Sequence, residues 1–127
     1  ATLIDLDAPV IVAGDYNVMP TDRDVYAPER WRDDALFAPE VRAAYQALLD
    51  QGWSDAIRQL HPDETIYSFW KYWRGAFERN AGLRIDHLLL NPVAARMLKA
   101  AEVDTVPRGW EKTSDHAPVV ITLDQAP

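Results

Sequence analysis

The sequence predicts a mixed α/β fold of about five short strands and two helices. Three observations lead to this prediction. Short apolar runs rich in β-branched residues are spread along the chain, a single long stretch has helical spacing, and a second helix has a start signal of its own. With 127 residues, of which 48% are hydrophobic, the chain suits one domain with a real core.

The first half of the chain predicts one strand, one loop and one helix. Residues 9–13 form an apolar run that ends at Gly14, which is typical of a strand buried on both faces. Residues 20–38 hold two prolines and several aspartates, so we expect a long loop with room for one helical turn. Pro39 then opens a helix at its first position, and Gly52 marks where that helix has ended.

The second half predicts four more strands and a short helix. We expect strands at residues 65–70, 83–90, 102–106 and 119–123, with an irregular connection over residues 71–82. Asn91 can cap a helix, and Pro92 can start it and carry it through residue 101. Two helices cover only one face of such a sheet. The bare face therefore indicates that a partner layer is missing.

Composition and charge narrow the classes of function. The chain contains no cysteine, which excludes disulfides and thiolate metal sites and is compatible with a cytoplasmic location. No apolar run approaches the roughly 20 residues of a membrane span, so we expect no membrane partner. The net charge of -7 argues against nucleic-acid binding. Residues 67–112, however, hold eight basic against five acidic residues, which gives +3 there and -10 elsewhere. Chance variation of surface charge is the alternative reading.

Asp15 and Asn17 follow the first predicted strand directly. A carboxylate and an amide two residues apart can project the same way, and together they suit a water molecule or a phosphate oxygen. The alternative is a turn in which the Asp15 side chain only closes the strand end.

Asp86 interrupts the most apolar strand, where a carboxylate is costly unless it is paired or functional. Strand alternation places Arg84 on the same face, so an internal Arg84–Asp86 ion pair is the alternative to a functional role. His87 points to the opposite face and is expected to be a packing residue.

The run Ser114, Asp115 and His116 enters the last predicted strand. A carboxylate directly before an imidazole is a compact acid–base or phosphate-binding unit. Neighbouring residues cannot form the line of a Ser-His-Asp triad, and the sequence has no Gly-x-Ser-x-Gly elbow, so acyl transfer is excluded.

Residues 67–77 interleave aromatic and basic side chains, a pattern that suits base stacking and phosphate neutralisation. A core strand followed by a covering loop is the alternative, with Tyr67 and Phe69 as the core members. The candidate DNA-binding residues of this segment are Phe69, Trp70, Lys71, Trp73 and Arg74.

The order of these motifs resembles the C-terminal half of exonuclease III-type AP endonucleases, members of the endonuclease/exonuclease/phosphatase superfamily. The Gly-Asp-x-Asn motif at residues 14–17 and Ser-Asp-His at 114–116 are shared across that superfamily. Three further motifs resemble the exonuclease III branch in particular. They are Leu-Arg-Ile-Asp at residues 83–86, Ser-Phe-Trp-x-Tyr at 68–72 and Glu-Lys-x-Ser-Asp-His-Ala-Pro at 111–118. Phe69 stands where the family pattern has tryptophan.

The resemblance implies a role for each matching residue. Asp15 would be the catalytic carboxylate, Asn17 would orient the scissile phosphate, and Asp86 would orient polar groups of the site. Asp115 would fix His116 and touch the metal, and His116 would hold a phosphate oxygen. Together these roles describe metal-assisted hydrolysis with magnesium as the cofactor and manganese as the alternative.

The resemblance also implies that residues 1–127 form the C-terminal half of a domain about twice as long. The family fold is a DNase I-like four-layer α/β sandwich, of which this chain would supply one mixed, mostly antiparallel sheet with helices on one face. The N-terminal half, with the main glutamate ligand of the metal, would be absent.

Three functions follow as hypotheses. The first is an AP endonuclease and 3'-to-5' exonuclease of DNA repair that acts on double-stranded DNA with abasic sites or 3' ends. The second is a sister phosphoesterase acting on an inositol phosphate, a phospholipid or another phosphodiester. The third holds that the 127-residue fragment alone is inactive and self-associates through its bare sheet face.

Overall fold

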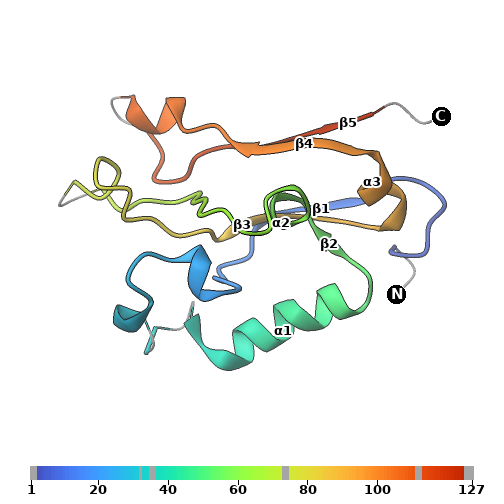
Figure 1. The fold of residues 1–127 in the computed structure, drawn as a ribbon, viewed down its shortest axis with the longest axis horizontal. Helices are drawn as coiled ribbons and strands as arrows, with labels where there is room; N and C mark the ends of the chain where they lie inside the picture. The colour runs from blue at the N-terminus through green and yellow to red at the C-terminus, as the bar shows by residue number, and fades with distance from the viewer. Residues whose placement is uncertain (1–2, 32, 35–36, 73–74, 111–112, 125–127) are drawn as a thin grey trace.

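Two antiparallel sheets and three α-helices make up the computed structural model, which describes residues 3–31, 33–34, 37–72, 75–110 and 113–124. The first sheet has the order β1-β3-β2, with β1 at Ile11–Asp15, β2 at Ser54–Asp55 and β3 at Asp86–Leu90. The second pairs β4 (Leu98–Val103) with β5 (Val119–Leu123). In the view of Figure 1 the three-stranded sheet runs between α1 on one side and the β4–β5 pair on the other.

The helices begin where the sequence signals predict. Helix α1 spans Pro39–Asp50 with proline at its first turn. Helix α3 spans Pro92–Met97, and the Asn91 side chain caps it by accepting a hydrogen bond from the backbone amide of Ala94 at 2.9 Å. Between them, α2 (Ala56–Leu60) and the short strand β2 were not predicted. The mixed α/β fold class is confirmed, and no described helix is long and apolar enough to cross a membrane.

Several element boundaries differ from the prediction. Residues 65–70 do not form a strand, because the segment pairs only through isolated bridges of Phe69 with Leu83 and His116. Regular pairing of β3 begins at Asp86 rather than at Leu83, since Leu83 bonds to Phe69 instead. Helix α3 ends at Met97, and β4 starts at once, four residues before the predicted strand. Residues 20–38 contain short 3₁₀ turns at Asp22–Asp24 and Pro28–Arg30, as the expected loop allowed.

Strand β1 is exposed along its whole length, so the prediction of a strand buried on both faces is wrong. The strand lies at the edge of its sheet and pairs with β3 alone. Ile11 and Val12 therefore keep 39% and 38% of their surface exposed. The single sheet that we expected is also divided in two, because the part of the chain that the structure describes holds no regular ladder between β3 and β5.

The described residues form four apolar clusters, and residues of β3 take part in two of them. Leu90 packs with Ile57 of α2 and Ala101 of β4, which joins the two sheets. Leu89 packs with Val18 and with Tyr45 of α1. Strand β3 is therefore the central element against which the helices and the second sheet are fixed.

A buried ionic cluster lies beside β3, and we call it the Arg84 cluster. Arg84 is 1% exposed and bonds to Asp24 through Nε at 2.6 Å. It also holds both carboxylate oxygens of Asp55, at 3.0 and 2.8 Å. The other members contact these three residues directly; they are Tyr45, Arg58 and His87. The Arg84–Asp86 ion pair weighed as an alternative is absent, because Arg84 uses its donors here.

The titrating groups of the cluster have their charges fixed by this arrangement. Burial alone would raise the pKa of Asp24 and of Asp55, but the Arg84 guanidinium outweighs it, and both pKa values are lowered. Burial lowers the pKa of His87, and the charge of Arg84 lowers it further. The neutral His87 ring accepts from Arg84 at Nδ1 and donates from Nε2 to the Val18 carbonyl at 2.9 Å. His87 is thus a buried packing residue, as expected.

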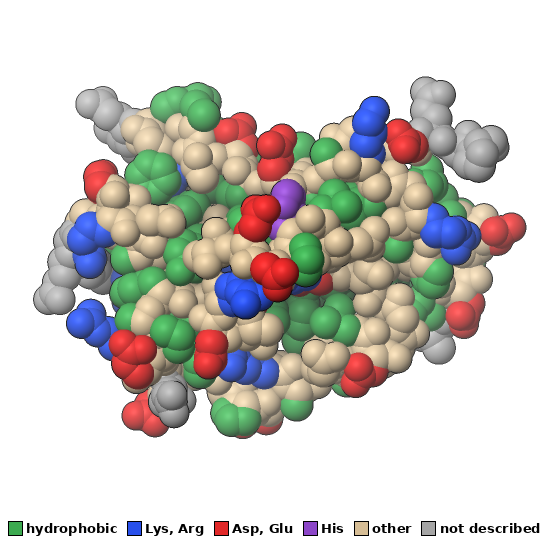
Figure 2. Space-filling model, in the orientation of Figure 1, with side chains coloured by type: hydrophobic (Ala, Val, Ile, Leu, Met, Phe, Trp, Pro, Cys, Tyr) green, Lys and Arg blue, Asp and Glu red, His purple; other side chains and the backbone are tan. Residues whose placement is uncertain are grey.

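Much of the basic excess of residues 67–112 does not reach the surface. Arg84 is buried in its cluster, and Arg108, 8% exposed, donates to the carbonyls of Trp70 and Lys71. On the face drawn in Figure 2, basic side chains are scattered among acidic ones rather than gathered in a patch. The charge count of this segment is therefore weak support for a nucleic-acid surface.

We predict that Arg84→Ala lowers the free energy of unfolding by about 3–5 kcal/mol, because it leaves the buried Asp55 carboxylate without a cation and Asp24 with Arg58 alone. Denaturant unfolding followed by circular dichroism measures this change. Arg23→Ala is the matched control, since Arg23 forms an exposed ion pair with Asp63 at 3.4 Å. The control should change stability by at most about 1 kcal/mol. Equal effects of the two substitutions would show that the Arg84 cluster does not stabilise the fold.

Candidate active site

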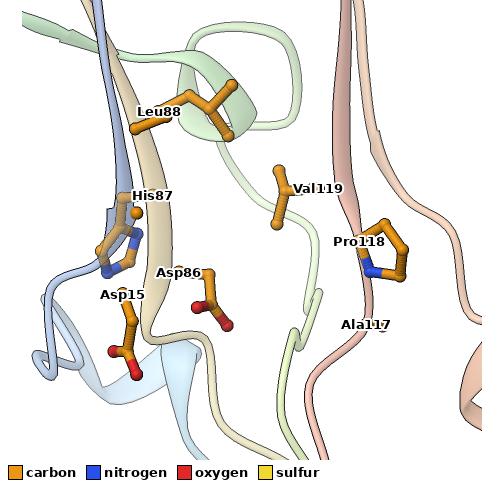
Figure 3. Close-up of a pocket in the computed structure, with 9 residues that line it drawn as sticks. Asp15, Asp86, His87, Leu88, Ala117, Pro118 and Val119 are labelled. Atoms are coloured by element: carbon orange, nitrogen blue, oxygen red, sulfur yellow. The ribbon is translucent and has the colours of Figure 1, made fainter. Parts of the chain in front are cut away.

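Two carboxylates face each other across the first sheet. Strands β1 and β3 are antiparallel, and their register pairs Asp15 directly with Asp86. Figure 3 shows both side chains at the same end of the two strands, pointing the same way. Like charges directly opposite in a sheet repel each other. This position therefore favours a third group that can donate a hydrogen bond to the carboxylates.

His116 supplies that group from a segment far along the chain. Its Nδ1 lies 2.7 Å from Oδ2 of Asp86, so the ring donates a hydrogen bond to that carboxylate. Its Nε2 lies 3.7 Å from Oδ2 of Asp15. The ring of Phe69 packs edge-on against the imidazole, with 5.1 Å between ring centres. The site thus brings together Asp15, Asp86 and His116, three of the four predicted catalytic residues.

Asn17, the fourth, lies in the turn just after β1. Its backbone amide donates to Oδ1 of Asp15 at 2.8 Å, and its φ of 51° lies in the left-handed region that asparagine tolerates. The turn weighed as an alternative therefore exists, but it does not remove Asp15 from the site. One oxygen of Asp15 closes the turn, while the other faces His116.

Asp115 lies close to the His116 ring without a hydrogen bond to it. Its Oδ1 lies 3.8 Å from Nε2 of His116, beyond hydrogen-bond distance. The carboxylate that bonds to the ring is Asp86, and Asp115 lies about as far from Nε2 as Asp15 does. The sequence could not show this, because Asp86 and His116 are 30 residues apart.

The cluster has the chemistry of a site for a hard cation. Asp15, Asp86 and His116 each offer one ligand atom, and these atoms lie within 4.8 Å of one another. Carboxylate oxygens suit magnesium and manganese, and a metal there would relieve the repulsion between the two aspartates. One oxygen of Asp86 already accepts a hydrogen bond from His116 and is less available to a metal. These three residues therefore supply only part of a full coordination shell. The predicted metal ligand His116 belongs to the cluster, whereas Asp115 does not.

A shallow hollow of about 280 Å³ adjoins the two carboxylates. It lies between the ends of β1 and β3 on one side and residues 117–119 on the other (Figure 3). Gly14 contributes to the wall without a side chain, and a Cβ there would meet no atom within 4 Å. The hollow is thus open enough to admit a group that reaches Asp15 and Asp86.

The residues predicted to bind DNA have different surroundings. Trp70 is 2% exposed, donates from its indole to Asn80 at 3.1 Å and packs on Phe77, so the prediction that it contacts DNA is wrong. Phe69 is half-buried and supports His116. Lys71 is exposed, and its amine lies 5.1 Å from the centre of the Trp31 ring. Trp73 and Arg74 lie outside the described residues.

Sequence reasoning missed Asp24 and Asp55, which hold Arg84, and Ser68, which bonds to the backbone at the start of β3. Asp55 caps helix α2 by accepting from Arg58, and that capping pattern was the available signal. The signal for Asp24 was the Thr-x-x-Asp capping box that it forms with Thr21 at the start of a 3₁₀ turn. Ser68 was missed because it is a small hydroxyl residue within a run of aromatic side chains, and the aromatic pattern gives no sign of its role.

Comparison with known proteins agrees with these motifs. The chain is 36% identical to exodeoxyribonuclease III of Haemophilus influenzae over 91% of its length. It matches the structure of an AP endonuclease from Archaeoglobus fulgidus with a TM-score of 0.89, 36% identity and 94% of the chain covered. A structure of the 3' phosphatase NExo from Neisseria, bound to a product DNA hairpin, gives a TM-score of 0.88 and 40% identity over 91% of the chain.

These matches cover only part of each relative. The chain spans 46% of the Haemophilus protein, 48% of the Archaeoglobus chain and 45% of the Neisseria chain. The family described as Endonuclease/Exonuclease/phosphatase matches residues 1–116, a range that includes Asp15, Asp86 and His116. This chain therefore belongs to the endonuclease/exonuclease/phosphatase family.

Proposed function

We propose that the protein hydrolyses phosphodiester bonds of DNA as an AP endonuclease and 3'-to-5' exonuclease in DNA repair, with magnesium as its cofactor. The observation that carries this proposal is the convergence of Asp15, Asp86 and His116 at one end of the β1–β3 pair. The names of the similar proteins support DNA as the substrate, since they include an exodeoxyribonuclease, an AP endonuclease and a 3' phosphatase bound to a DNA hairpin.

The proposed hydrolysis of a phosphodiester gives each residue of the site a task. Asp86 accepts a hydrogen bond from Nδ1 of His116 and so orients the ring, with Nε2 left to contact a phosphate oxygen as negative charge develops there. Oδ2 of Asp15 faces the same space and can take the proton of the attacking water. Asn17 would orient the phosphate from the adjoining turn. A divalent cation held at these carboxylates would neutralise charge on the phosphate.

We predict that Asp15→Asn and His116→Ala each lower the turnover of abasic-site duplex DNA by at least about 100-fold in the full-length protein, because each removes a group that handles a proton or charge. Steady-state cleavage of a labelled duplex measures this loss. Thermal unfolding should stay near that of the unaltered protein.

His61→Ala is the matched control for His116→Ala. His61 bonds through Nε2 to the Ala101 carbonyl at 2.8 Å, away from the cluster. Its substitution should leave turnover within about twofold. If His116→Ala or Asp15→Asn retained full turnover, the proposed roles would be ruled out.

A sister phosphoesterase is the second candidate, favoured by the net charge of -7 and by the scattered basic side chains on the face drawn in Figure 2. We expect cleavage of abasic duplex to exceed that of inositol phosphates by more than about 100-fold, and a chelator to abolish it until magnesium or manganese is restored. A substrate panel with and without chelator measures both quantities. Preference for an inositol phosphate would support the second candidate, and full turnover in excess chelator would contradict the cofactor.

We propose further that a chain limited to these 127 residues is inactive and self-associates. The support is the exposed edge strand β1, where Ile11 and Val12 lie bare, and Val120 of β5, which is 42% exposed. We predict that light scattering finds dimers or larger species, and that Val12→Lys shifts them toward monomer, because a charge at the edge opposes pairing. Glu102→Lys is the control, an exposed charge change on β4. A monodisperse monomer at all concentrations would contradict the self-association.

A further inference from the structure

We propose that Ser68 is a positioning residue that joins the two halves of the Asp86–His116 pair. This inference rests on the proposed function, because it concerns the same site. Ser68 is 0% exposed, and it touches the backbone next to both members of the pair. No part of it approaches the reacting atoms, so its effect is exerted through Asp86 and His116.

The side chain of Ser68 fixes the start of β3. Its Oγ accepts hydrogen bonds from the backbone amides of Ile85 and Asp86, each at 3.2 Å. These are the residues at which the chain changes from the irregular pairing of Leu83 to the regular ladder of β3. One hydroxyl oxygen therefore sets the backbone from which the Asp86 carboxylate projects.

The backbone around Ser68 fixes the other half. The Ser68 carbonyl accepts from the amide of Ala117 at 2.8 Å, and the amide of Trp70 donates to the Asp115 carbonyl at 2.9 Å. These two bonds flank His116 on both sides. Between them Phe69 packs its ring against the imidazole. The segment 68–70 thus lies between Leu83 and His116 and pairs with both.

Close packing leaves this segment little freedom to move. A Cβ on Gly82 would lie 2.6 Å from Nε1 of Trp70 and 2.8 Å from Cβ of Tyr67, so only glycine permits the approach. The Ser68 amide itself donates to the Leu83 carbonyl at 2.8 Å. Because the segment is held on both sides, losing the Ser68 hydroxyl displaces the start of β3 relative to His116, and the 2.7 Å contact between Asp86 and His116 lengthens.

Ser68→Ala tests this role, since it leaves two buried amides without their acceptor while adding no bulk. The first readout is the proton resonance of His116 Nδ1–H, identified by its absence in His116→Gln. The second is the exchange rate of the Ile85 and Asp86 amides. In the full-length protein we expect the resonance to move toward that of an unbonded imidazole, both amides to exchange faster, and kcat on abasic duplex to fall by about tenfold to 100-fold with KM little changed.

Asn91→Ala is the matched control. Asn91 is also 0% exposed, and its Oδ1 likewise accepts from two backbone amides, those of Val10 and Ala94, beyond the far end of β3. It should lower stability at least as much, since Nδ2 of Asn91 also donates to the Ala8 carbonyl at 2.9 Å, without moving the His116 resonance. Ser68→Thr keeps the hydroxyl oxygen and should restore the resonance and kcat. If Ser68→Ala does not fold, Ser68→Cys, whose thiol is a weak acceptor of similar size, replaces it in the comparison.

The outcomes separate this inference from the proposed function. If Ser68→Ala changes the His116 resonance no more than Asn91→Ala does, Ser68 has only a structural role and the inference is overturned. If the unaltered protein cleaves no DNA but the resonance responds as expected, the proposed function fails while the positioning role of Ser68 stands.

Discussion

The pairing of Arg84 with Asp24 and Asp55 is the constraint on which the rest of the structure depends. Asp24 comes from the loop after β1, Asp55 from β2 and Arg84 from the segment before β3. Their exposed fractions are 0%, 6% and 1%, respectively. A buried guanidinium without such partners would be strongly destabilising, so the three segments are committed to one arrangement. Tyr45 adds helix α1 by donating to Asp55 at 2.8 Å.

The cluster also explains why simple alternation fails at the start of β3. Alternation would put Arg84 and Asp86 on one face, but regular pairing begins only at Asp86. Arg84 and His87 both turn into the buried cluster, where their side chains are 3.1 Å apart. Asp86 between them is left to face His116. Because the backbone before β3 is irregular, Arg84 and His87 can enter the buried cluster while Asp86, which lies between them in the sequence, faces the site.

The fold and the site were predictable to different extents. The strand after Pro118, the helix at Pro39 and the motifs around Asp15 and His116 follow from local patterns, because caps, β-branched runs and polar interruptions act over a few residues. The partners of Arg84 lie 60 and 29 residues away, and such contacts leave no local pattern. Trp70 was misread for the same reason: its burial depends on Asn80 and Phe77, packed against it by a fold that the aromatic spacing alone does not reveal.

Charge balance links the cluster to the chemistry of the site. Two arginines, Arg58 and Arg84, meet two aspartates, and His87 is neutral, so the cluster as a whole carries no net charge. Arg84, although only two residues from Asp86, is therefore not available to neutralise it. The carboxyl groups of Asp15 and Asp86 lie together at one strand end and contact the His116 imidazole instead. The proposed phosphodiester substrate would meet this negative charge, and a cation bound at the two carboxylates would offset it where Arg84 does not.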